Sequence, residues 1–173
     1  MNDTYLTTAR LLCQVAPVVM ADSVFALKGG TAINLFLRDM PRLSVDLDLV
    51  FPDHRPGRTE TRATINESLR AAKVRLTQLG FDVAAVSARD LGETKLLVRR
   101  DGILIKVEVN TVMRAVVNPT QTRSLSDVAS RALMADLELA LVSPEDVYGG
   151  KTRRSNGPAA SARSIRRDAA LRT

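Results

Sequence analysis

Apolar residues recur at helical or strand spacing through most of the chain, and this pattern predicts alternating helices and strands. Helices are predicted at residues 6–20, 31–38, 60–79 and 126–134. Strands are predicted at residues 24–27, 45–51, 81–86, 94–99, 103–109 and 137–142. Pro17 is expected to kink or end the first helix. Asp101 and Gly102 predict a hairpin turn, and Ser143 followed by Pro144 predicts the start of a last helix.

The stretch 45–51 alternates strictly between apolar and polar residues, with Asp46 and Asp48 at the polar positions. Residues i and i+2 of a strand project to the same face, so these carboxylates are expected to lie close enough to share a divalent cation. Glu108, in the predicted strand 103–109, is a candidate third carboxylate. The same three acids could also be only the wet face of an antiparallel sheet.

Gly29 and Gly30 lie between the predicted strand 24–27 and the helix that begins at Thr31. A glycine turn before a helix exposes backbone N–H groups at the positive end of the helix dipole, which suits a phosphate group. A glycine pair is also the ordinary composition of a tight turn. The glycine pair alone does not distinguish a phosphate-binding turn from an ordinary one. The pair of aspartates about fifteen residues further on favours the phosphate-binding interpretation.

Two motifs in this order, KGGTAINL at 28–35 and RLSVDLDL at 42–49, resemble the AbiEii/AbiGii-type nucleotidyltransferases, which are the toxins of bacterial toxin–antitoxin pairs. The KVEV run at 106–109 and the YGGK run at 148–151 also look like motifs of that family. The resemblance covers about residues 24–151. It implies an α/β (α+β) fold of the polymerase-beta-like nucleotidyltransferase type, in which helices flank a mixed sheet.

The resemblance also implies an activity, namely Mg²⁺-dependent transfer of NMP from an NTP to an acceptor hydroxyl, with tRNA as the acceptor in some relatives. A cognate antitoxin is an expected partner. Asp46, Asp48 and Glu108 would be the catalytic acids and would bind Mg²⁺ in a two-metal site. The residues expected to bind the nucleotide are Lys28, Gly29, Gly30, Thr31, Ser44, Lys106 and Lys151. Lys28 and Lys106 could instead only balance a neighbouring carboxylate.

Composition narrows the function classes further. The 173 residues are 45% hydrophobic and 25% charged, which is typical of one folded domain. A single Cys and a single His exclude a disulfide framework and a zinc site built from Cys or His pairs. The chain has neither a long apolar run nor the pattern of a signal peptide, so a cytoplasmic protein with no membrane partner is expected.

The positive charge is concentrated at one end. The net charge is +6, and residues 152–173 contain six Arg and one Asp. We therefore expect a core domain over residues 1–151 and an Arg-rich tail over 152–173 with little structure of its own. The tail lacks the Arg-Asp-Leu-x-Asp pattern that follows YGGK in the family, so a C-terminal truncation that impairs activity is expected.

A shifted reading frame would explain the tail. Synonymous codons for residues 156–169 can be chosen so that reading one base later encodes MDRQHPRDLFDVM, which contains the missing pattern. One inserted base just after the Lys151 codon is the corresponding hypothesis, and sequencing the gene there would test it. Two other readings stay open: a catalytically dead remnant that binds nucleotide or antitoxin, and a basic RNA-binding protein that acts through its tail.

Overall fold

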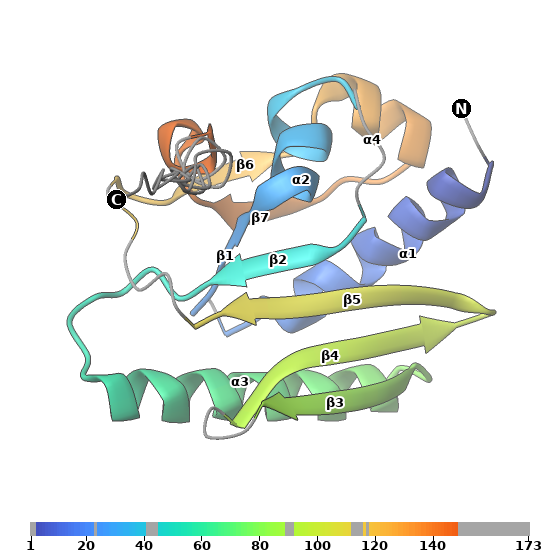
Figure 1. Cartoon of the computed structure of the whole chain (residues 1–173). Helices are drawn as coiled ribbons and strands as arrows, with labels where there is room; N and C mark the ends of the chain where they lie inside the picture. The colour runs from blue at the N-terminus through green and yellow to red at the C-terminus, as the bar shows by residue number, and fades with distance from the viewer. Residues whose placement is uncertain are drawn as a thin grey trace, which may run out of the picture.

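The computed structural model describes residues 3–22, 24–40, 45–88, 92–111, 116 and 118–148, which form a seven-stranded mixed sheet with helices packed on it (Figure 1). The helical elements are α1 (Asp3–Val19), α2 (Gly29–Thr31), the π-helix η1 (Ala32–Leu37), α3 (Arg58–Gln78) and α4 (Asp127–Leu133). The strands are β1 (Ala26–Lys28), β2 (Leu47–Val50), β3 (Asp82–Ala88), β4 (Gly92–Arg100), β5 (Ile103–Asn110), β6 (Gln121–Ser124) and β7 (Glu138–Leu141).

The strand order is β3-β4-β5-β2-β1-β7-β6. Two neighbouring pairs are parallel, β2 with β5 and β1 with β7, and the other pairs are antiparallel. A mixed sheet with helices is the predicted fold class, which is therefore confirmed. Among the helices that the structure describes, none combines the length and the apolar character that crossing a bilayer requires.

Helices α1 and α3 cover one face of the sheet and lie behind β5, β4 and β3 in the view of Figure 1. Of the apolar stripe predicted for this helix, Ile65, Leu69, Ala72 and Leu76 are buried, whereas Leu79, which follows the end of α3, is 56% exposed. Alternate residues of the strands meet the buried face of α3, namely Leu96 and Val98 of β4 and Ile105 and Val107 of β5. The intervening residues point to the other face, where Lys106 and Glu108 are exposed.

A second, smaller apolar cluster covers part of that other face. Its buried members are Ala26, Ile33, Val50, Val142 and Val147. Because neighbouring residues of a strand point to opposite faces, Ala26 and Val50 lie on the side away from α1 and α3. The cover comes from η1 and from a helical turn at residues 144–148. The second face is thus covered over β1 and open over β5 and β4.

Most predicted elements are confirmed in place, and the exceptions have physical reasons. Helix α1 continues for two residues beyond Pro17, so Pro17 does not end the helix. Strand β2 is shorter than the predicted strand 45–51. Strand β6 was not predicted, because its sequence QTRS is polar and mostly exposed at the edge of the sheet and so shows no apolar period.

The predicted hairpin turn between β4 and β5 is confirmed. Asp101 and Gly102 both have positive φ, at 52° and 77°. Two central residues with positive φ are the geometry that matches the twist of a two-residue hairpin. The predicted helix start is also confirmed, since the Ser143 hydroxyl accepts a hydrogen bond from the Asp146 amide at 3.2 Å.

Replacing Leu69 on the buried face of α3 tests the packing of this helix on the sheet. The Leu69 side chain is fully buried, so Leu69→Ala is expected to lower the free energy of unfolding by about 2–5 kcal/mol. Val74→Ala, at an exposed position of the same helix, is the matched control and should change it by less than about 0.5 kcal/mol. Urea unfolding followed by circular dichroism measures both, and equal effects would contradict the packing described.

Cys13 on α1 provides a chemical probe of the same packing. Burial raises the pKa of the Cys13 thiol from its ordinary value of 9.0 to about 11. The thiolate is the reactive form, so alkylation by iodoacetamide at pH 8 is expected to be about 100-fold slower in the folded chain than in urea. The rate should keep rising with pH up to about 11. A folded-state rate equal to the urea rate would mean that α1 does not pack as described.

Candidate active site

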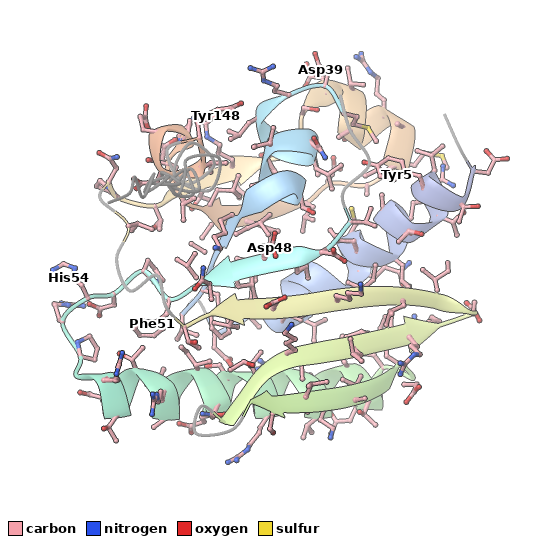
Figure 2. The ribbon with its side chains drawn as sticks, in the orientation of Figure 1. Tyr5, Asp39, Asp48, Phe51, His54 and Tyr148 are labelled. Carbon is pink, nitrogen blue, oxygen red and sulfur yellow. The ribbon has the colours of Figure 1, made fainter. Side chains whose placement is uncertain are left out.

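Strand β2 brings Asp48 between two charged residues of its neighbours. Asp48 has two Cα partners in the sheet, Lys28 on β1 and Glu108 on β5. Paired residues on adjacent strands have their side chains on the same face of the sheet. Lys28, Asp48 and Glu108 therefore stand side by side where the open part of the second face begins, and Figure 2 shows Asp48 at this place on β2.

These three residues line one cavity of about 330 Å³. The complete lining is Lys28, Asp48, Thr94, Glu108, Val109, Asn110 and Thr111. Most of these side chains are polar, and several come from the C-terminal end of β5, which is where ligands bind in open α/β sheets. The volume lies within the range of small-molecule sites. The cavity can therefore hold a small polar ligand against the two carboxylates.

Gly29 follows β1 directly and packs against Asp48. Its φ is +78°, a conformation that residues with a side chain rarely adopt. A Cβ at this position would overlap the carboxylate oxygen Oδ2 of Asp48 and lie 3.2 Å from its Cβ. Glycine is thus required here both by the turn and by the close approach to Asp48. The predicted glycine turn is confirmed as a structural feature beside the carboxylates.

Thr31 has a structural role in this part of the fold. Its side chain is fully buried, and its hydroxyl donates a hydrogen bond to the backbone carbonyl of Asp46 at 2.6 Å. This bond ties α2 to the segment that enters β2. Thr31 therefore helps to fix the position of the strand that carries Asp48.

Asp46 lies one residue before β2, and its side chain is exposed. The regular strand that would have aligned Asp46 with Asp48 begins only at Leu47. Among the residues that the structure describes, no group of three or more Asp, Glu, His or Cys side chains is arranged to hold a metal ion. The structure thus brings Asp48 and Glu108 together and does not bring Asp46 into a three-carboxylate cluster with them.

The pair nevertheless fits the chemistry of Mg²⁺. This ion prefers oxygen ligands and is usually held by one or two carboxylates, with substrate phosphates and water completing its coordination. Asp48 and Glu108 provide two carboxylates at paired positions of adjacent strands. The missing side chain of Gly29 leaves Oδ2 of Asp48 without a neighbouring Cβ to crowd it.

Two of the remaining predicted site residues, Lys106 and Gly30, lie within the described part of the chain. Lys106 is exposed on the same face of β5 as Glu108, opposite Leu97 of β4, and does not line the cavity. Gly30 belongs to α2. Ser44 and Lys151 lie outside the described residues, as does the predicted tail 152–173. His54, which was not predicted as a site residue, lies in the loop that follows β2 (Figure 2).

Tyr148, the last residue that the structure describes, contacts Arg38, which directly follows η1. Arg38 Nε donates a hydrogen bond to the Tyr148 hydroxyl at 3.1 Å, and the guanidinium carbon lies 5.8 Å from the centre of the Tyr148 ring. A cation near an aromatic face at this range is attracted to it. The first residue of the YGGK run is therefore tied to the helix that follows Gly29 and Gly30.

Sequence reasoning missed Lys95. Its Nζ lies 3.2 Å from Oε1 of Glu108, and the two residues are Cα partners on β4 and β5. The hairpin turn contained the necessary signal: it pairs Arg100 with Ile103, and counting back five residues on β4 and forward five on β5 pairs Lys95 with Glu108.

A comparison of structures identifies the fold. The chain is similar to MenT4, a nucleotidyltransferase toxin from Mycobacterium tuberculosis H37Rv, with a TM-score of 0.57 and 23% sequence identity. The similarity covers 87% of this chain and 54% of MenT4, so the chain spans about half the length of that protein. At this identity the likeness shows the fold alone, which is that of a nucleotidyltransferase.

The family follows from the sequence match. The family described as "Nucleotidyl transferase AbiEii toxin, Type IV TA system" matches residues 10–169, and the chain belongs to this family. The resemblance seen in the motifs is thereby confirmed. The match also includes most of the Arg-rich segment after residue 151. Comparison with curated proteins gives no match.

Substituting Gly29 tests its contact with Asp48. Gly29→Ala is expected to lower the free energy of unfolding by about 1–3 kcal/mol, because it adds a Cβ both at positive φ and against the carboxylate. Gly57→Ala is the control: no atom lies within 4 Å of a Cβ there, and an effect below about 1 kcal/mol is expected. Thermal unfolding of both variants measures the difference, and a neutral Gly29→Ala would contradict the close approach.

Proposed function

We propose that the chain transfers NMP from an NTP to an acceptor hydroxyl and releases pyrophosphate. The observation that carries the proposal is the pairing of Asp48 with Glu108 on adjacent parallel strands, beside the glycine turn and inside a polar cavity. In the reaction, the acceptor oxygen forms a bond to the α-phosphorus, and the bond from that phosphorus to the pyrophosphate oxygen breaks in line. The acceptor hydroxyl gives up its proton to solvent water, and pyrophosphate is the leaving group.

Asp48 and Glu108 would hold Mg²⁺, with Asp46 as a further carboxylate close by in the chain. When bound, the ion neutralises triphosphate oxygens and stabilises the charge that develops on the leaving pyrophosphate. Lys28, paired with Asp48 and lining the cavity, would place an ammonium group next to the phosphates. Gly29 and Gly30 carry no side chain that would keep the triphosphate away from the backbone of the turn.

The acceptor we propose is tRNA. The six Arg residues among residues 152–173 would attract a polyanionic partner to that end of the chain. A cognate antitoxin is the second partner we propose, on the strength of membership in a toxin–antitoxin family. Glu108 and Asp48 are accessible from the open face of the sheet, so an acceptor strand has a route to the cavity.

The test incubates the purified chain with each α-labelled NTP, Mg²⁺ and total tRNA, and measures label on RNA. Asp48→Asn and Glu108→Gln are each expected to lower transfer by about 100-fold or more, because a metal-binding carboxylate is lost. Asp101→Asn is the matched control for the first, since asparagine tolerates the positive φ of this hairpin residue. Glu138→Gln, exposed on β7, is the control for the second.

A version with the proposed reading frame restored after Lys151 is assayed alongside. Label on RNA from both versions supports an active enzyme. Label only from the restored version favours the alternative that this chain is a remnant that binds without transferring. If neither version labels RNA, but RNA binding is lost on deletion of residues 152–173 and falls steeply with salt, the RNA-binding alternative is favoured.

A further inference from the structure

Lys95 completes a row of four charged residues that crosses the sheet at the site. The Cα partners run from Lys28 on β1 to Asp48 on β2, from Asp48 to Glu108 on β5, and from Glu108 to Lys95 on β4. Partners on adjacent strands share a face, so the order of charges across the open face is positive, negative, negative, positive. The two carboxylates thus stand between two ammonium groups.

Lys95 does not itself line the cavity, but its ammonium group lies beside Glu108, which does. The Nζ of Lys95 lies 3.2 Å from Oε1 of Glu108, whereas its partner on the other side, Val86 of β3, carries no charge. The side chains of Lys95 and Glu108 are 45% and 53% exposed. An ion pair at such exposure adds little to stability, typically no more than about 1 kcal/mol. Stability alone therefore gives little reason for a lysine at this place.

This arrangement would let Lys95 exchange Glu108 for another anionic partner. Asp48 and Glu108 would hold a divalent cation, and such an ion would compete with the Lys95 ammonium for the Glu108 carboxylate. A lysine has a flexible four-carbon stem and acts as a mobile point charge for phosphate. A phosphate group bound in the cavity beside Glu108 would offer that ammonium a new anionic partner.

We propose that Lys95 is a substrate-binding residue that pairs with Glu108 in the free protein and contacts a phosphate oxygen of the metal-bound triphosphate. This assignment rests on the proposed function of the Asp48 and Glu108 pair. It gives Lys95 opposite effects on two ligands. Toward a divalent cation alone it is unfavourable, because it repels the ion and competes for Glu108. Toward the metal–triphosphate complex it is favourable.

Lys95→Met therefore separates this role from a purely structural ion pair. The affinity for Mn²⁺ alone, measured by electron paramagnetic resonance, is expected to rise about two- to fivefold. The affinity for Mg²⁺–tripolyphosphate, measured by calorimetry, is expected to fall about tenfold, as for the loss of one charge-assisted hydrogen bond. Lys95→Arg keeps the charge and should stay within about threefold of the wild type for tripolyphosphate.

Lys73→Met, on α3 and so on the opposite side of the sheet, is the matched control and should leave both affinities unchanged. Lys95→Gln repeats the test with a polar side chain if the methionine variant does not fold. If a folded Lys95 variant changes both affinities by less than twofold, the assignment of Lys95 is overturned. The proposed function is still supported in that case if the wild-type chain binds the probes and Asp48→Asn abolishes the binding. If the wild-type chain binds neither probe, both the assignment and the proposed function are overturned.

Discussion

The pairing of β2 with β1 on one side and β5 on the other is the interaction on which the rest of the site depends. Strand β2 has only four residues, yet its backbone places Asp48 between Lys28 and Glu108. Successive side chains of a strand point to opposite faces of the sheet. A slip of one residue in β2 would therefore turn Asp48 toward α1 and α3 and bring a leucine to the site. The chemistry is therefore set by backbone register.

Apolar packing on both sides of β2 holds that register. Leu47 and Leu49 are fully buried in the main core with α1 and α3, and Val50 is buried in the second cluster under η1. Each such side chain contributes about 1.5–3 kcal/mol when fully buried. That energy offsets the repulsion between the neighbouring carboxylates of Asp48 and Glu108. The flanking lysines reduce the repulsion further.

The tight junction after β1 adds a second constraint. Gly29 has the positive φ that turns the chain out of the strand, and its missing side chain lets the backbone approach Asp48. Two residues later, the Thr31 hydroxyl bonds to the carbonyl of Asp46, on the segment that enters β2. The glycine turn and the aspartate strand, about fifteen residues apart, are thus one structural unit. Their joint occurrence in the sequence has this physical basis.

The sequence by itself predicted most of the elements and named Asp46, Asp48 and Glu108 as candidate carboxylates, because apolar periodicity and turn residues report on local conformation and on which face is buried. It also contained the hairpin register that pairs Lys95 with Glu108. Only the tertiary structure decided that β2 begins after Asp46 and lies parallel to β5, and that Thr31 is buried. Those features arise from contacts between segments far apart in the chain, which no local pattern encodes.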